Sequence, residues 1–230
     1  MHLKCKNLNF LYPDSKSAVI NNLSFSMKNP GFNAIFGPSG VGKTSLAKII
    51  VNKNNCFNEN IITKNINIIL YSYNLERLPG WLNLGKHINK VISPEKLHLK
   101  KTLIKIFELN NVLDSRFSNL SMGQQNRINL IRYLLQDFDV LIMDESLANV
   151  DEKLKGTIIL AIKELFPDKM FLYISHNLME VSKFCHKILV LGNPSQNKPC
   201  FIINGQNYKK KCFLDKKKLN ITMLEIMNAL

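Results

Sequence analysis

The stretch Gly-Pro-Ser-Gly-Val-Gly-Lys-Thr at residues 37–44 constrains this chain more than any other feature. Glycines let a backbone take positive φ values and approach an anion without a clashing Cβ. A loop of this kind that leads into a helix aims successive N–H groups at bound phosphate. The pattern predicts a nucleotide site in which Lys43 reaches the β- and γ-phosphates and the Thr44 hydroxyl ligates Mg²⁺. The residues expected to bind nucleotide here are Gly37, Pro38, Ser39, Gly40, Val41, Gly42, Lys43, Thr44 and Ser45.

The sequence on either side of the loop fits this prediction. Residues 31–36 form a short apolar run, and residues 45–51 carry apolar side chains at helical spacing. Strand, loop and helix in this order are the setting that such a phosphate loop requires. An incidental glycine-rich turn is the alternative, and the flanking pattern argues against it.

Length and composition favour one large α/β domain. The chain has 230 residues, of which 46% are hydrophobic, and no segment approaches the roughly 18 uninterrupted apolar residues of a membrane span. The first residues lack the apolar run of a signal peptide, so we expect a soluble protein of a cytoplasmic compartment. The five cysteines are scattered without a Cys-x-x-Cys pair, which favours buried or idle thiols over a zinc or redox centre.

The net charge of +14 raises the hypothesis of a nucleic-acid partner. Almost all of the excess is lysine, however, and lysine is abundant along the whole chain together with Asn and Ile. This distribution favours a compositional bias over a binding groove. The lysine blocks at 209–211 and 216–218 can either contact anionic lipid or form a solvated tail.

The order of apolar patterns predicts a mostly parallel sheet with two additions. Short alternating runs at 3–10 and 19–27 predict antiparallel strands at the N-terminus. Helical spacing between residues 84 and 135 predicts an inserted helical subdomain. Unbroken apolar runs at 140–143 and 170–174 predict parallel strands that are buried on both faces. Further strands are expected at 31–36, 66–71, 187–192 and 200–203, with helices at 152–166 and 219–230.

Polar residues follow two of these predicted parallel strands. Asp144 and Glu145 end one strand, and His176 comes just after another. Open α/β sheets place their ligand sites at such carboxyl ends. An aspartate there can hold Mg²⁺ together with Thr44, while the neighbouring glutamate can accept a proton from an attacking water. We expect His176 to hydrogen-bond the γ-phosphate and orient that water.

Two further features complete the set of candidates. Tyr12 precedes the loop and could either stack on an adenine ring or pack on a strand end. Residues 120–124, Leu-Ser-Met-Gly-Gln, place small side chains directly before an apolar helix and so predict a second anion-accepting end. Since the chain already has one phosphate loop, this second element suggests use in trans, on the nucleotide of another subunit.

These motifs, in this order, resemble the nucleotide-binding subunit of an ATP-binding cassette (ABC) transporter. The resemblance covers residues 3–203 and implies a P-loop NTPase core with an N-terminal antiparallel β subdomain. It implies an ATPase domain at 1–205, with its helical subdomain at about 76–136, and a short basic tail at 206–230. The residues it implies are Tyr12 for adenine, Lys43, Glu145 and His176 for catalysis, Ser121, Met122, Gly123 and Gln124 for the signature in trans, Asp151 for the D-loop, and Thr44, Asp144 and Asn74 for the metal.

Three departures from the family pattern stand out. Met122 replaces the first glycine of Leu-Ser-Gly-Gly-Gln, and Asn74 stands where the family carries the Q-loop glutamine. The D-loop at 147–151 reads Leu-Ala-Asn-Val-Asp, although Asp151 is kept. None of these changes removes a catalytic group, so we expect an active ATP hydrolase that uses ATP and Mg²⁺.

The resemblance also implies partners. In this family two ATPase subunits pair head to tail, and each ATP lies between the phosphate loop of one and the signature of the other. The segment at 77–82, Arg-Leu-Pro-Gly-Trp-Leu, is similar to a segment of importer ATPases for nitrate, sulfonates and taurine, which implies a small organic or anionic solute. We therefore expect a subunit on the cytoplasmic face of the membrane, with permease subunits and an extracytoplasmic solute-binding protein, and no nucleic acid. The alternatives are a soluble ABC protein that acts on ribosomes or nucleic acid, and an exporter ATPase.

Overall fold

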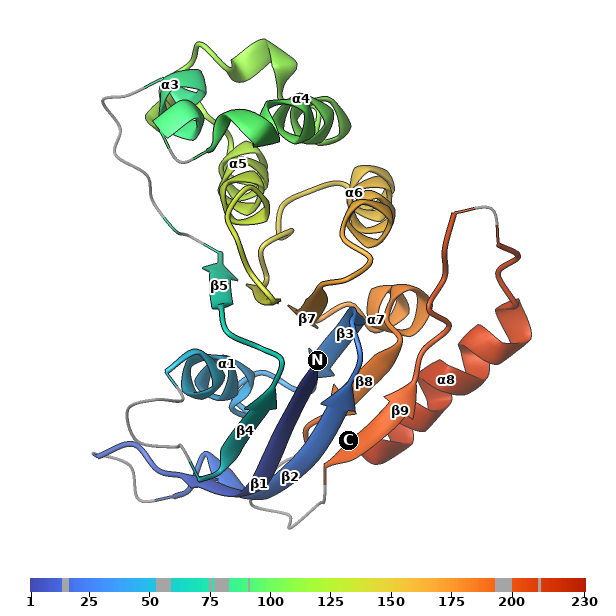
Figure 1. The fold of residues 1–230 in the computed structure, drawn as a ribbon. Coiled ribbons are helices and arrows are strands. Elements are labelled where there is room, and N and C mark those ends of the chain that lie inside the picture. The colour runs from blue at the N-terminus through green and yellow to red at the C-terminus, as the bar shows by residue number, and fades with distance from the viewer. Residues whose placement is uncertain are drawn as a thin grey trace. The chain divides into compact units, whose positions relative to one another are not determined.

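The computed structural model describes residues 1–13, 17–52, 59–74, 76, 83–90, 92–192, 200–210 and 212–230. These residues form two compact units (Figure 1). The first unit consists of Met1–Tyr71, Asp139–Asp144 and Phe166–Leu230, and the second of Ser72–Phe138 and Glu145–Leu165. The importer-like segment at 77–82, with its Trp81, lies outside the described residues, as do Cys56 and Lys211.

A small antiparallel sheet opens the first unit. It contains β1 (His2–Phe10), β2 (Ile20–Lys28) and β4 (Ile61–Lys64), in the order β2-β1-β4. Leu23, Phe25 and Met27 alternate with exposed residues along β2, so one face of the strand packs on the core. The strands predicted at 3–10 and 19–27 are confirmed. Strand β4 was not predicted, because a single buried residue, Ile61, gives no alternation to detect.

The larger sheet has six strands in the order β5-β6-β7-β3-β8-β9. Strands β6, β7, β3 and β8 run parallel to one another, and β9 is antiparallel to β8. Every residue of β6 and β7 is buried, which explains their unbroken apolar sequence. The bounds are β3 Gly31–Phe36, β5 Ile69–Tyr73, β6 Val140–Asp144, β7 Met170–Ile174, β8 Lys187–Val190 and β9 Phe201–Asn204. The predicted parallel core is therefore confirmed.

Strand β5 begins three residues later than the run predicted at 66–71. The carboxylate of Asp139 takes the backbone N–H groups of Asn67 and Ile68, at 2.6 and 3.1 Å, so that these groups are bound to a side chain. The bond from Asn67 is the main reason why the pKa of Asp139 lies below its usual value. The Asp139 side chain thus binds the backbone N–H groups of the residues that were predicted to begin the strand.

The described residues of the first unit form the helices α1 (Lys43–Val51), α7 (Leu178–Phe184) and α8 (Lys216–Ala229). Helix α8 lies alongside α7 and β9 (Figure 1). It starts three residues before the helix predicted at 219–230, because the Asp215 side chain accepts the backbone N–H of Lys218 at 3.1 Å and caps the first turn.

The second unit is helical. Its elements are α3 (Leu84–Lys90), η1 (Pro94–Lys96), α4 (Leu97–Ile106), η2 (Asn110–Val112), η3 (Phe117–Asn119), α5 (Met122–Leu134) and α6 (Glu152–Leu165). Leu103, Phe107 and Ile131 are fully buried within it, and α4 packs on both α5 and α6. Across the described ranges of both units, no helix combines the length and the apolar character needed to cross a bilayer.

Candidate functional site

The glycine-rich loop joins β3 to α1 in the first unit. Gly42 is the N-cap of α1, with a left-handed φ of 97°, and no side chain caps the helix there. An uncapped first turn leaves its N–H groups to an anion. A Cβ at Gly37 would lie 2.5 Å from the carbonyl oxygen of Leu191, so this position has no room for a side chain. The local geometry is that of a phosphate-binding loop.

Lys43 lies against the loop that precedes it. Its ammonium donates to the carbonyl oxygens of Gly37 at 2.8 Å and Pro38 at 2.6 Å, and the residue is only 6% exposed. A charged group buried to this extent must be hydrogen-bonded. These carbonyls hold the ammonium beside the N–H groups of the loop, which is where phosphate oxygens would bind.

Three neighbouring strands bring the other candidates of the first unit to one edge of the sheet. In the order β6-β7-β3, Asp144 ends the first strand, His176 follows the second, and the loop follows the third. Asp144 pairs with Ile174, and Ile35 pairs with the same residue from the other side. The sequence-based prediction that these carboxyl ends share an edge is therefore confirmed.

The Asp144 carboxylate accepts hydrogen bonds from two hydroxyl groups. Thr44 Oγ1 and Tyr71 Oη each donate to Asp144 Oδ2 at 2.8 Å, and Asp144 is 7% exposed. Mg²⁺ prefers oxygen ligands such as hydroxyl and carboxylate oxygens. The Thr44 hydroxyl and the Asp144 carboxylate therefore fit the Mg²⁺ ion that the fold family uses. Tyr71 was not predicted, because nothing in its sequence separates it from other aromatic residues on an apolar strand.

Tyr12 reaches the helix that follows the loop. Its hydroxyl lies 2.9 Å from Ser45 Oγ, and its ring packs edge-on against Phe10 with 4.8 Å between the ring centroids. Tyr12 is 44% exposed, so the residue remains accessible to a stacking partner. The structure thus brings Tyr12 and Ser45 together.

A buried acid fixes the turn that carries His176. Glu180 Oε2 accepts from Tyr173 Oη at 2.8 Å and from Ser175 Oγ at 3.1 Å. Burial, with the nearby Glu180 charge, raises the pKa of Tyr173 well above its usual value, so the phenol stays a donor. Asn177 caps α7 by accepting the backbone N–H of Glu180 at 3.1 Å. His176 is exposed on the turn between these anchors.

The signature residues begin helix α5 in the second unit. The Ser121 hydroxyl accepts the N–H of Gln124 at 3.3 Å, and the Gln124 side chain accepts the N–H of Ser121 at 2.9 Å, which makes a capping box. A hydroxyl that accepts still has its own hydrogen to donate. Met122 is 50% exposed, whereas Gly123 is buried against backbone: a Cβ there would lie 2.2 Å from the carbonyl oxygen of Asn149.

The other three candidates also belong to the second unit. Glu145 follows β6 with a left-handed φ of 51°. Asp151 Oδ1 accepts the N–H of Leu154 at 2.9 Å and so supports the start of α6. The Asn74 amide oxygen accepts from Asn126 Nδ2 at 3.0 Å. Lys43, Thr44, Asp144, Tyr12 and His176 thus form one group within the first unit, and Asn74, Glu145, Asp151 and the signature form another within the second.

A phosphate loop, its lysine and a Thr–Asp pair at the carboxyl edge of a parallel sheet define a P-loop nucleotide-binding protein. The profile of the ABC transporter family matches residues 20–148, and the chain belongs to this family.

Curated relatives and solved structures agree with this assignment. The chain is 30% identical over 208 residues to the Fe(3+) ions import ATP-binding protein FbpC of Fusobacterium nucleatum, with 83% of this chain and 56% of the relative covered. It is 29% identical to the nickel import ATP-binding protein NikE of Shigella boydii, with 76% and 75% covered. It therefore spans little more than half the length of the FbpC relative. A dimeric ATP-binding cassette in a post-hydrolysis state, bound to ADP and Pi, superposes with a TM-score of 0.70 at 21% identity, with 83% of this chain and 94% of that chain covered, and shows the same fold.

Proposed function

We propose that this chain is the ATP-binding and ATP-hydrolysing subunit of an ABC transporter, and that it powers import through separate membrane subunits. The observation that carries the proposal is the 2.8 Å contact between Thr44 and Asp144, which are 100 residues apart in sequence. This contact places a hydroxyl and a carboxylate beside the phosphate loop, and the helix that follows the loop has no side-chain cap. Both relatives described above are named import ATP-binding proteins, which supports the direction of transport.

Within this proposal, the first unit holds the nucleotide. The loop N–H groups and the Lys43 ammonium bind the β- and γ-phosphates, and the Tyr12 ring receives the adenine. Thr44 and Asp144 would hold Mg²⁺, and we propose Asn74 as a further ligand. When bound, the ion would supply positive charge beside the phosphate oxygens.

The proposed reaction is attack of water on the γ-phosphate. Glu145 accepts a proton from that water, and His176 orients the water through a hydrogen bond to the phosphate. Lys43 acts by electrostatic stabilisation of the transferred group.

We further propose that the productive site needs two copies of the chain or a paralogous subunit. The capping box at Ser121 and Gln124 presents the first turn of α5, with the Gly123 backbone, to the nucleotide of the partner. Met122 and Asp151 lie in the same dimer contact. A chain with one phosphate loop and one signature can satisfy both in a head-to-tail pair.

The remaining partners are permease subunits and an extracytoplasmic solute-binding protein, with the ATPase bound at the cytoplasmic face of the membrane. The two relatives carry the names of different solutes, Fe(3+) ions and nickel, so the family relationship leaves the solute open. Our prediction of a small organic or anionic solute rests on residues 77–82, which lie outside the described residues.

Two measurements test the proposal, one on the purified chain and one by co-purification. We expect Mg²⁺-dependent release of phosphate from ATP, and we expect an affinity-tagged chain with Glu145→Gln to co-purify with membrane proteins from its native host. Recovery with RNA or ribosomes, and without membrane proteins, would replace this proposal with the nucleic-acid alternative. Absence of hydrolysis in the dimer would refute the enzymatic part.

A further inference from the structure

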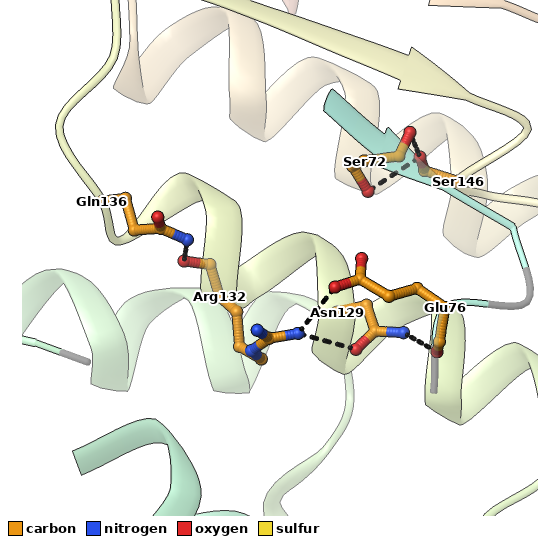
Figure 2. A network of polar contacts seen from close by, with 6 residues as sticks. All are labelled: Ser72, Glu76, Asn129, Arg132, Gln136 and Ser146. Atoms are coloured by element: carbon orange, nitrogen blue, oxygen red, sulfur yellow. Dashed lines mark hydrogen bonds and ion pairs between the residues drawn. The ribbon is translucent and has the colours of Figure 1, made fainter. Parts of the chain in front are cut away.

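One face of helix α5 carries hydrogen-bonding side chains at a spacing of three residues: Asn126, Asn129 and Arg132. Side chains three apart lie above one another on a helix. Figure 2 shows Asn129 and Arg132 reaching the same neighbour, Glu76. The Asn129 amide donates to the Glu76 carbonyl oxygen at 2.6 Å, and Arg132 pairs with the Glu76 carboxylate at 3.3 Å. These contacts attach α5, the helix that begins at the signature, to Glu76 in the segment that follows β5.

Asn126, the first of the three, holds two segments at once. Its Nδ2 donates to the Asn74 amide oxygen at 3.0 Å and to the Ala148 carbonyl oxygen at 2.9 Å. Asn126 is 4% exposed, so both of its amide hydrogens have protein partners in a place that water hardly reaches. Loss of this amide would leave two acceptors without their donor, which is more harmful than loss of a surface hydrogen bond.

Two further contacts join the same segments. Ser146 Oγ lies 2.9 Å from both the carbonyl oxygen and the hydroxyl of Ser72, and both serines are buried (Figure 2). Gly123 approaches the Asn149 backbone so closely that no Cβ fits between them. The end of β5 with Asn74, the residues after Glu145 and the start of α5 are therefore in contact with one another, and Asn126 contacts Asn74 and Ala148 through one amide group.

We propose that Asn126 is a positioning residue that makes the Glu145-to-Asp151 segment move together with the signature helix. The proposal rests on the function proposed above. In a head-to-tail dimer the signature contacts the nucleotide of the partner, while Glu145 and Asn74 serve the nucleotide of their own chain. A shift of α5 that follows engagement of the partner's nucleotide reaches Glu145 through Asn126, without passing through the phosphate loop.

The first test needs no nucleotide. Hydrogen–deuterium exchange of the full chain compares Asn126→Ala with Asn129→Ala, a matched control of the same residue type on the same helix face, which is 1% exposed and holds Glu76. We expect Asn126→Ala to speed exchange of the amides at 146–150 by about tenfold and Asn129→Ala to leave them unchanged. Equal exchange at 146–150 in the two variants, or no change in Asn126→Ala, would overturn the proposal.

The second test separates positioning from binding. We expect Asn126→Ala to lower kcat by about tenfold while the ATP affinity of the isolated chain stays within about twofold of wild type. Asn126→Asp keeps the shape but cannot donate, so it should lose at least as much. Because Asn74 is itself a proposed ligand of Mg²⁺, the test compares variants of Asn126 alone, and a kcat of Asn126→Ala equal to that of wild type would overturn the proposal. A wild-type chain without ATP turnover would refute the function proposed above, while the exchange experiment would still decide the role of Asn126.

Discussion

The two groups of candidate residues are held together by different chemistry. In the first unit, Lys43 and Asp144 are ionisable and less than 10% exposed, and each makes hydrogen bonds to two partners. In the second unit the side chain that connects the segments, Asn126, is a neutral amide. Buried charge is suited to binding a charged ligand, whereas a neutral amide holds segments in register without attracting one. The comparison supports the two proposed roles, which are nucleotide binding for the first group and positioning for Asn126.

The largest expected effect comes from the residue at the boundary of these groups. Glu145 directly follows Asp144, the last residue of the first unit's β6. Glu145→Gln keeps the shape and removes the base, so we expect turnover to fall by about 10²- to 10⁴-fold while ATP still binds. Steady-state phosphate release and ATP-dependent dimerisation by gel filtration measure the two properties. Glu152→Gln, at an exposed position of α6, is the matched control and should behave like wild type. Steady hydrolysis by the Glu145 variant would show that another group is the base.

The next effect tests how tightly the second unit is packed. Gly123→Ala places a Cβ 2.2 Å from the Asn149 carbonyl oxygen, so α5 or the D-loop must move. We expect a loss of about 1–3 kcal/mol in the free energy of unfolding, measured with urea, and weaker ATP-dependent dimerisation. Gly85→Ala in α3 is the control, because its Cβ meets the Leu113 carbonyl oxygen at an ordinary 3.5 Å and alanine favours a helix. Equal stability of the two variants would mean that the Gly123 contact gives way easily.

Most of the nucleotide-binding group could be predicted from sequence, because its residues are adjacent along the chain or end neighbouring parallel strands. The loop at 37–44, Asp144 and His176 follow three strands that lie side by side, so the topology alone brings them to one edge. Tyr12 is the intermediate case. Its place before the loop suggested an aromatic contact, but its hydroxyl bond to Ser45 depends on the path of a turn that spacing does not specify.

The contacts within the second unit could not be predicted in this way. Asn126 meets Asn74 across 52 residues and Ala148 across 22, and neither distance in sequence corresponds to a period of helix or strand. Nothing in the sequence distinguishes a helical asparagine whose side chain binds two other segments from an asparagine that makes no such contacts. The same difficulty applies to Tyr71, whose hydroxyl is the only feature that distinguishes it from an apolar residue of β5.

A smaller effect tests whether the first group depends on neutral donors as well as on charge. Tyr71→Phe removes one of the two hydroxyl groups that fix Asp144 Oδ2. We expect the Mg²⁺ concentration for half-maximal binding of a fluorescent ATP analogue to rise about two- to tenfold, since one neutral hydrogen bond orients the carboxylate. Tyr73→Phe, on the same strand and 44% exposed, is the control. An unchanged Mg²⁺ requirement would assign the Tyr71 hydroxyl to packing alone.

The smallest effect is expected at the most visible departure from the family pattern. Met122 is the first residue of α5 and is 50% exposed, and the capping box and the Gly123 contact involve neighbouring residues and backbone. Met122→Gly should therefore leave kcat within about twofold of wild type or raise it, since glycine is less harmful in the first turn than in a helix interior. Ser121→Ala gives the contrast, because it removes the N-cap hydroxyl and should destabilise α5 by about 1 kcal/mol. A severe loss of turnover in Met122→Gly would show that the methionine side chain itself, and not only the backbone beside it, stabilises the proposed dimer contact.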